Sequence, residues 1–348
     1  MDLQAIVFEK DELAIIDQTL LPGRLVYIKP DSINETIEAI RMLKVRGAPA
    51  IGITVAYALY IEANKIRNEN IPQFRKKIES AAQQLEKSRP TAVNLKWAIE
   101  RMRRIYKSTQ TVSEIVRKMR QEALLIHEED RQACRQMGIN GLDVLPGNPC
   151  SILTHCNSGS LATGGWGTAL GVIYAAQEKG YQLHVYTTET RPLGQGARLT
   201  FYELMQHNIP CTLIADSAAA SLMATGKVDI VLFGADRIAR NGDVANKIGS
   251  YALACAAKLH GIPCYAVAPV STFDLTTETG AGIPVEKRGA SELLSWYHYP
   301  STLPQHASVY NPAFDITKAK YLSGIITEKC IIKEPYEKMI EKYIKTLN

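Results

Sequence analysis

The sequence has no long hydrophobic run and no pair of cysteines spaced C-x-x-C. Its longest apolar stretch, residues 51–61, is shorter than the roughly 20 residues that a membrane-spanning helix needs. The seven cysteines are an odd number, which disfavours a disulfide framework and a cysteine-ligated zinc site. Acidic residues interrupt the first segment where a signal peptide would be apolar. We therefore expect a protein of the reducing cytoplasm that does not enter a membrane.

An excess of one charge is also missing. The chain carries 40 Lys and Arg against 35 Asp and Glu, and the two signs are interspersed, as in residues 122–130. A nucleic-acid-binding surface needs clustered basic residues, so the sequence disfavours nucleic acid as a partner. The small positive excess suits an anionic metabolite instead. A length of 348 residues favours two globular domains.

The pattern of apolar residues changes twice along the chain. Short β-like runs occupy residues 5–8, 13–16 and 25–28. From residue 31 to about 140, apolar side chains recur at helical spacing. Beyond residue 146, short apolar runs alternate with helical segments, which is typical of βαβ units in a parallel sheet. These runs are residues 151–154, 183–187, 211–214, 230–233 and 264–268.

The sequence therefore predicts an α/β fold of two domains. Residues 1–145 would form an N-terminal β segment with a helical domain, and residues 146–348 a Rossmann-like domain with a parallel sheet. The glycines of residues 164–171 suggest an alternative, binding of a nicotinamide dinucleotide, with Glu189 as the ribose-binding acid. Their spacing is G-x-G-x-x-x-G and not the required G-x-G-x-x-G directly after the strand. We interpret them as glycines for close packing of a helix against the sheet.

Two of the predicted strands are followed by reactive side chains. Cys156 follows the first, in Thr-His-Cys-Asn-Ser-Gly over residues 154–159, and Asp236 follows the fourth, in Gly-Ala-Asp-Arg-Ile over residues 234–238. If both strands belong to one parallel sheet, the thiol and the carboxyl share its carboxyl edge. Ligands bind at that edge in open α/β sheets. The sequence thus predicts an active site that contains both groups.

Each of these residues also has a structural interpretation. A cysteine is often a small buried hydrophobe, and Asp236 would otherwise cap a loop or pair with Arg237. Backbone amides after Cys156 favour a role in chemistry, because they can polarise a thiolate. His155 cannot readily act as its base, since consecutive strand residues point to opposite faces. Asp236 has an apolar run behind it, a setting that suits a carboxylic acid that donates a proton near neutral pH.

Three predicted helix starts suit a phosphate or sugar hydroxyls, because the first N–H groups of a helix are unpaired and carry its positive dipole end. They are residues 46–49, with Pro49 in the first turn, residues 195–198, and Asn246 with Lys247. In this interpretation residues 241–243 form a turn that leads into a helix beginning at Asn246. Arg89, within residues 88–91, adds a cation at a further helix start.

Together these segments resemble the methylthioribose-1-phosphate isomerases of the methionine salvage pathway. That family is related to regulatory subunits of translation initiation factor 2B and to ribose-1,5-bisphosphate isomerases. The resemblance covers nearly the whole chain. The segments that carry it are residues 45–52, 88–92, 154–159, 189–192, 195–198, 234–238, 241–243, 246–249, 268–274, 311–315 and 324–328.

The resemblance implies that Cys156 and Asp236 are the catalytic pair. It implies a phosphorylated pentose as substrate, a homodimer, and neither a metal nor an organic cofactor. Asp236 would protonate the ring oxygen of 5-methylthioribose 1-phosphate, and Cys156 would assist hydrogen transfer from C2 to C1, which gives 5-methylthioribulose 1-phosphate. The residues implied to hold the substrate are Arg46, Gly47, Ala48, Arg89, Gln195, Asn246 and Lys247.

Alternatives remain open from the sequence. Ribose 1,5-bisphosphate or 5-deoxyribose 1-phosphate would be the substrate of a related isomerase. A non-catalytic regulatory subunit is expected to lack Cys156, Asp236 and the N-terminal β segment, and this chain has all three. A methylthio group needs an apolar pocket, for which Trp166 and Tyr57 are candidates.

Overall fold

A computed structural model of the chain describes residues 3–89, 93–108, 111–294 and 308–344. The chain divides into two compact units, residues 1–136 with 158–171, and residues 137–157 with 172–348. The sequence predicted two domains with a boundary between residues 145 and 146. A domain is a part that folds by itself, so this boundary stays a prediction. Within the described residues, none of the helices combines the length and the apolarity that crossing a membrane requires.

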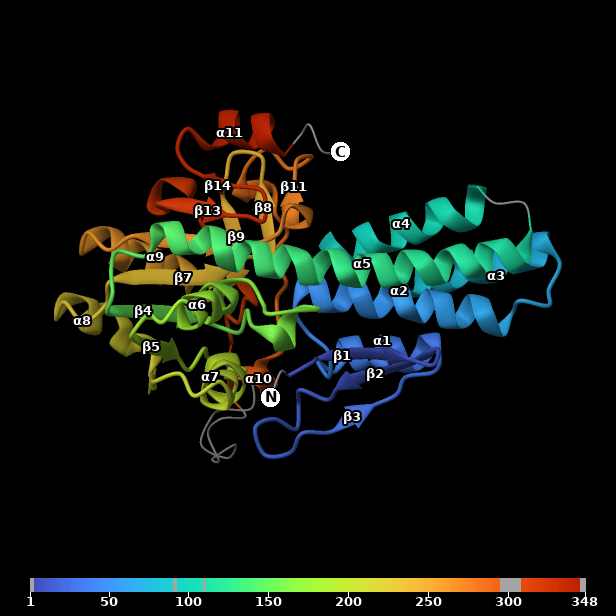
Figure 1. Ribbon diagram of the computed structural model, residues 1–348, viewed down its shortest axis with the longest axis horizontal. Helices are drawn as coiled ribbons and strands as arrows, with labels where there is room; N and C mark the ends of the chain where they lie inside the picture. The colour runs from blue at the N-terminus through green and yellow to red at the C-terminus, as the bar shows by residue number, and fades with distance from the viewer. Residues whose placement is uncertain (1–2, 90–92, 109–110, 295–307, 345–348) are drawn as a thin grey trace. The chain divides into compact units, whose positions relative to one another are not determined.

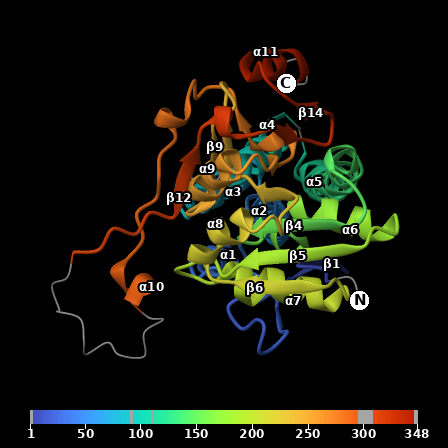
Figure 2. The ribbon, with the colours of Figure 1, turned by 90° about the vertical axis from the view of Figure 1, so that its left-hand side faces the viewer.

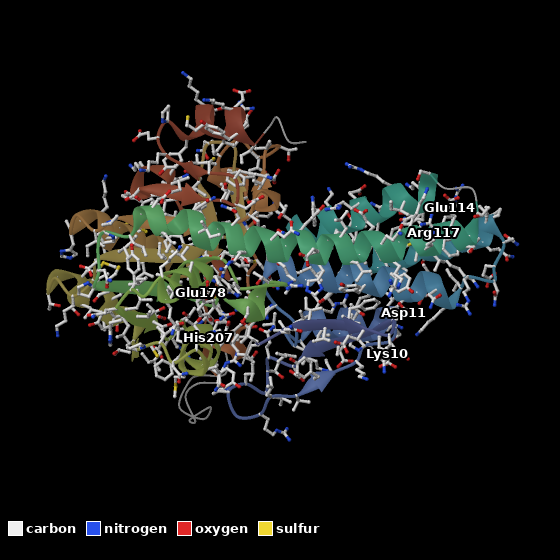
Figure 3. All side chains as sticks on the ribbon, viewed as in Figure 1. Lys10, Asp11, Glu114, Arg117, Glu178 and His207 are labelled. Carbon is white, nitrogen blue, oxygen red and sulfur yellow. The ribbon has the colours of Figure 1, made fainter. Side chains whose placement is uncertain are left out.

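The first unit begins with a three-stranded antiparallel sheet of β1 (Ile6–Glu9), β2 (Glu12–Ile16) and β3 (Tyr27–Ile28). Lys10 and Asp11 form the turn between β1 and β2 (Figure 3), with φ of 50° and 63°. Positive φ at both central residues is the turn geometry that matches the twist of a hairpin. The three short β runs predicted from the sequence are confirmed.

Five helices follow, in the region that helical spacing predicted to be mostly helical (Figure 1). The Ser32 hydroxyl caps the first by accepting from Glu35 N at 3.3 Å. The second is apolar on every side because it packs against the first, third and fourth. Met137, near the end of the fifth, begins the second unit. The helices are α1 (Ile33–Arg41), α2 (Ala48–Lys65), α3 (Ile71–Glu86), α4 (Val93–Ser108) and α5 (Val112–Gly141).

The second unit is built on a seven-stranded sheet with the order β14-β13-β10-β7-β4-β5-β6. All neighbours are parallel except β13 and β14. Figure 2 shows β4, β5 and β6 side by side. The strands are β4 (Cys150–His155), β5 (Leu183–Thr188), β6 (Cys211–Ile214), β7 (Ile230–Gly234), β10 (Cys264–Val267), β13 (Gly324–Ile326) and β14 (Ile331–Ile332). The five parallel strands predicted from the sequence are confirmed.

The remaining helices alternate with these strands or follow them. They are α6 (Ala169–Glu178), α7 (Phe201–Gln206), α8 (Ala219–Ala224), α9 (Ser250–Leu259), α10 (Ala290–Leu294) and α11 (Tyr336–Tyr343). Val231 and Phe233 of the central β7 are fully buried and belong to the main core of this unit.

The strand order reverses between β4 and β7. From β4 the chain adds β5 and then β6 on one side, and afterwards it adds β7, β10 and β13 on the other. In a doubly wound sheet the loops part at such a reversal and leave a crevice at the carboxyl ends of the strands. The residues that follow β4 and β7 therefore lie where a ligand site is expected.

A second, four-stranded sheet corrects one prediction. Asn246 and Lys247 do not open a helix, because they are the last residues of β9 (Val244–Lys247), and α9 begins only at Ser250. The predicted turn at residues 241–243 is confirmed, but it joins β8 (Arg237–Ala239) to β9 as a hairpin. β9 also pairs with β12 (Phe314–Thr317), while β11 (Phe273–Asp274) pairs with β8. A strand partner so far along the chain leaves no signal in the local sequence.

The glycines of residues 164–171 serve close packing, as predicted, but their partner is not the sheet. A Cβ on Gly164 would lie 2.5 Å from Cδ2 of His127, on α5. A Cβ on Gly167, where φ is 89°, would lie 2.4 Å from the Cα of Gly159. The glycines therefore allow the backbone to approach α5 and the 158–159 loop within the first unit.

Candidate active site

Cys156 is the first residue after β4, and its thiol is half-buried. Its φ of 62° lies in the left-handed region, which residues with a Cβ seldom adopt. Cys156 N donates to Thr190 Oγ1 at 2.9 Å, and Cys156 O accepts from Thr200 Oγ1 at 2.5 Å. The thiol therefore lies at the carboxyl end of β4, as predicted, on a backbone that is held from two directions.

His155, the preceding residue, is buried and fully engaged. Its Nε2 lies 2.9 Å from Ile248 O, and since a carbonyl only accepts, Nε2 carries the proton. Nδ1 then accepts from Thr188 Oγ1 at 2.7 Å. Burial lowers the pKa of His155 below its ordinary value, so the ring is neutral. Both nitrogens bind groups of the fold, consistent with the prediction that His155 does not act as a base for Cys156.

Asp236 lies in the loop between β7 and β8, and its backbone N donates to Ala245 O at 2.9 Å. This bond ties the loop to β9. The neighbouring Arg237 pairs with Asp274, with 3.2 Å between Nη1 and Oδ2. Arg237 thus has a partner of its own on β11. The half-buried Asp236 is accordingly placed at the end of β7 by the hairpin that follows it.

The register of β4 and β7 brings these two loops together. His155 lies opposite Phe233 in the parallel pair, so the chain passes to Cys156 and to Asp236 at the same edge. The expectation that both strands belong to one parallel sheet is confirmed. Among the residues that the structure describes, no three His, Cys, Asp or Glu side chains cluster in a way that could hold a metal ion.

Lys247 and Asn246 reach this edge from the small sheet. Ile248, next to Lys247, is the residue whose carbonyl binds His155. The Lys247 Nζ lies 4.8 Å from the centre of the Phe314 ring, on the neighbouring β12. The Asn246 amide donates to Ser250 Oγ at 2.7 Å. Lys247 therefore supplies a positive charge close to the end of β4, although it does so from a strand.

The N-terminus of α9 is satisfied by a carboxyl group that sequence reasoning missed. Asp315 accepts from Gly249 N at 2.7 Å and from Tyr251 N at 3.1 Å. Burial raises the pKa of Asp315 to about 6, while its hydrogen bonds and the charge of Lys247 oppose the shift. Residues 311–315 carried part of the sequence resemblance, but the pairing of β12 with β9 gives Asp315 this role.

Gln195 precedes a short π-helical segment, Gly196–Thr200, which continues into α7. The predicted helix start at residue 195 is confirmed. Gln195 is only 4% exposed, and its Oε1 accepts no hydrogen bond from any described residue. Buried amide oxygens are rarely left unpaired. A Cβ on Gly196 would lie 1.7 Å from Thr188 O, so this segment abuts the end of β5. An unpaired amide oxygen there suits a ligand hydroxyl.

The other predicted substrate contacts belong to the first unit. Arg46 is buried, Gly47 is the N-cap of α2 with φ of 93°, and Ala48 is its first residue. The predicted helix start with Pro49 in the first turn is confirmed. Arg89 precedes α4, and residues 90–92 of the predicted helix start lie outside the described residues. A shared site for these residues with Cys156 and Asp236 stays a prediction.

A parallel sheet with a reversal between β4 and β7, and with polar side chains after both strands, defines a doubly wound α/β protein with a ligand site at its carboxyl edge. Comparison with known proteins identifies the family within this class. The chain belongs to the Initiation factor 2 subunit family, whose model matches residues 44–334.

Relatives of known name support the resemblance seen in the sequence. The chain is 47% identical to a methylthioribose-1-phosphate isomerase of Pelotomaculum thermopropionicum, over 97% of this chain and 92% of the relative. It is also 47% identical to a 5-deoxyribose 1-phosphate isomerase of Petrotoga mobilis, over 96% of each chain.

Two solved structures have nearly the same fold. The 5-methylthioribose 1-phosphate isomerase of Pyrococcus horikoshii matches with a TM-score of 0.90 and 40% identity, over 99% of this chain and 96% of that one. The delta subunit of translation initiation factor eIF-2B from A. fulgidus matches with a TM-score of 0.87 and 40% identity, over 99% and 100%. The predicted family and the two-part α/β fold are confirmed.

Proposed function

We propose that this protein is an aldose–ketose isomerase that converts 5-methylthioribose 1-phosphate to 5-methylthioribulose 1-phosphate in methionine salvage. The observation that carries the proposal is the register of β4 with β7, because it puts a thiol and a carboxyl at the reversal of the sheet. The high identity to isomerases over nearly the whole chain supports the same reaction.

The chemistry begins with ring opening. The anomeric carbon of the substrate carries a phosphoester, so the sugar cannot open spontaneously to an aldehyde. Asp236 acts as the general acid and transfers its proton to the ring oxygen as the C1–O bond breaks. One hydrogen then moves from C2 to C1, and the C2 hydroxyl becomes the carbonyl of the ketose as its proton returns to the Asp236 carboxylate, which restores the acid. Cys156 assists this step, either by carrying the hydrogen as a proton or by stabilising charge while a hydride shifts directly.

Substrate binding follows from charge and from unpaired polar atoms. Lys247 offers a cation to the phosphate. The buried Gln195 Oε1, which has no partner among the described residues, accepts from a sugar hydroxyl. Asn246, Arg46, Gly47, Ala48 and Arg89 complete the proposed set of substrate contacts. The resemblance to methylthioribose-1-phosphate isomerases further implies that the protein works as a homodimer in the cytoplasm.

A related substrate is the main alternative. The Petrotoga mobilis relative is named for 5-deoxyribose 1-phosphate, which also has no charge at C5. Ribose 1,5-bisphosphate needs a further cationic site for its second phosphate. A regulatory role like that of an initiation-factor subunit requires neither Cys156 nor Asp236, and this chain carries both.

The test is a side-by-side assay of the purified protein on 5-methylthioribose 1-phosphate, 5-deoxyribose 1-phosphate and ribose 1,5-bisphosphate, with ketose formation as the readout. We expect the highest kcat/KM for 5-methylthioribose 1-phosphate. A higher value for another sugar would move the assignment to that substrate. Absence of ketose from all three would overturn the proposal.

A further inference from the structure

The backbone of Cys156 is held on both sides by buried threonine hydroxyls. We propose that Thr190 and Thr200 are positioning residues, which keep the Cys156 thiol at the carboxyl edge of the sheet. The role given to Cys156 in turnover rests on the proposed function. The geometric claim about the thiol does not, so the two can be tested separately.

The need for such support lies in the conformation of Cys156. With φ of 62°, Cys156 departs from the extended path of β4 immediately after His155. Residues with a Cβ occupy this region at a cost, and they do so where the surrounding structure determines the conformation. An extended Cys156 would continue the strand and would direct its thiol elsewhere. The direction of the thiol therefore depends on what holds the turn.

Two hydroxyls hold it from opposite sides. Thr190 Oγ1 accepts from Cys156 N at 2.9 Å, which fixes the peptide before the cysteine. Thr200 Oγ1 donates to Cys156 O at 2.5 Å, which fixes the peptide after it. Both threonines are 0% exposed, so water cannot replace either hydroxyl without a rearrangement.

The donor and acceptor roles around Thr190 form a directed chain. His155 Nε2 donates to Ile248 O, so His155 Nδ1 accepts the one hydrogen of the Thr188 hydroxyl. Thr190 Oγ1 lies 3.1 Å from Thr188 Oγ1 and 3.3 Å from Thr188 O, and it donates to Thr188. Its lone pairs then face Cys156 N. The neutral His155 thus sets the orientation of the hydroxyl that receives the cysteine amide.

Thr190 is itself anchored. Its φ is 63°, and Asp216 accepts from Thr190 N at 2.8 Å and from Arg191 N at 2.7 Å. The Asp216 carboxylate therefore holds the turn that presents the Thr190 hydroxyl.

Thr200 has a different anchor. Its Oγ1 accepts from Asn157 Nδ2 at 3.2 Å, so its hydrogen is left for Cys156 O. The same Asn157 amide donates to Glu203 Oε1 at 2.6 Å, and Glu203 also accepts from Tyr174 at 3.3 Å. Glu203 is fully buried, and Asn157 and Tyr174, which donate to it, are buried as well. The two hydroxyls are therefore supported independently of each other.

The test uses near-isosteric pairs. Thr190→Val and Thr200→Val remove the hydroxyl and keep the shape, whereas Thr190→Ser and Thr200→Ser keep the hydroxyl. Thr225→Val is the control, because the Thr225 hydroxyl donates to Leu222 O at 2.7 Å, at the C-cap of its own helix α8. The first readout is the rate of iodoacetamide alkylation at Cys156 against pH, followed by mass spectrometry of its peptide. The second readout is kcat and KM separately.

We expect each valine variant to shift the alkylation profile of Cys156 and to lower kcat by roughly tenfold or more. KM should change much less, because neither Thr190 nor Thr200 belongs to the proposed set of substrate contacts. The serine variants should recover most of the loss, and Thr225→Val should match the parent in both readouts. An unchanged alkylation profile in folded valine variants would overturn the proposal.

A measurement on the parent protein keeps the proposal testable if a valine variant does not fold. The Cys156 amide should exchange its hydrogen slowly, since Thr190 accepts it in a buried site. Fast exchange of that amide would overturn the proposal. The two claims can come apart. If the valine variants alter the alkylation profile of Cys156 and the separate variant Cys156→Ser is fully active, the positioning of the thiol is supported and the proposed role of Cys156 in turnover is contradicted.

Discussion

His155 of β4 lies opposite Phe233 of β7, although nearly eighty residues separate them in the chain. Because the two strands are parallel, the chain leaves both at the same edge, and Cys156 and Asp236 follow there. β5 and β6 occupy the other side of β4, so the two loops leave from strands that are direct neighbours in the sheet. This single pairing gives the proposed chemistry its thiol and its acid.

Asp236→Asn should lower turnover by about 10²-fold or more, because an amide cannot donate the proton that opens the ring. KM should change little. Steady-state kinetics would measure both. Asp229→Asn is a matched control, since Asp229 precedes the same strand β7 and accepts from Ser151 N at 2.7 Å at its other end. Near-parent turnover of Asp236→Asn would contradict the role as acid.

Cys156→Ser should abolish most activity with folding intact, because a hydroxyl is far less acidic than a thiol. Substrate should also protect Cys156 of the parent from alkylation. Cys211→Ser is the control, as Cys211 is likewise half-buried but begins the edge strand β6. If Cys156→Ser turns over like the parent, the cysteine has only a structural role.

Lys247→Ala should act mainly on KM. Loss of one charged contact to phosphate costs about 1.5–3 kcal/mol, which is roughly ten- to a hundredfold in affinity. The phosphate is bound in both the ground state and the transition state, so kcat should fall less. Inorganic phosphate should compete with substrate in the parent and less well in the variant.

Lys320→Ala is the matched control for that experiment, because the Lys320 ammonium also lies over an aromatic ring, 5.2 Å from the centre of Tyr321. Its KM should equal that of the parent. An unaltered KM and unaltered phosphate inhibition in Lys247→Ala would mean that the phosphate binds elsewhere.

Asp315→Asn should change how stability depends on pH. The pKa of Asp315 is about 6 in the folded chain and about 4 in an unfolded one, so the folded state binds the proton more tightly. Its contribution to the free energy of unfolding therefore decreases as pH rises from about 4 to about 6, and is constant above. Urea unfolding at several pH values should show this decrease in the parent and not in the variant. If the free energy of unfolding depends on pH in the same way in the parent and in Asp315→Asn, the raised pKa of Asp315 is contradicted.

Much of the fold follows from local sequence. Short apolar runs predict five strands of the parallel sheet, and helical spacing predicts the helical region that contains α1 to α5, because apolar periodicity reports which face of an element is buried. The positions of Cys156 and Asp236 at strand ends follow for the same reason. The family could be recognised because its motifs are short segments around those strand ends.

Only the tertiary structure decided how these segments meet. β9 is a strand because β8 and β12 pair with it, and so Asn246 and Lys247 end a strand where local sequence suggested a helix. The roles of Thr190, Thr200 and Asp315 likewise depend on partners from other strands and loops. Local periodicity encodes burial, whereas hydrogen bonds between distant segments arise only once the chain has folded.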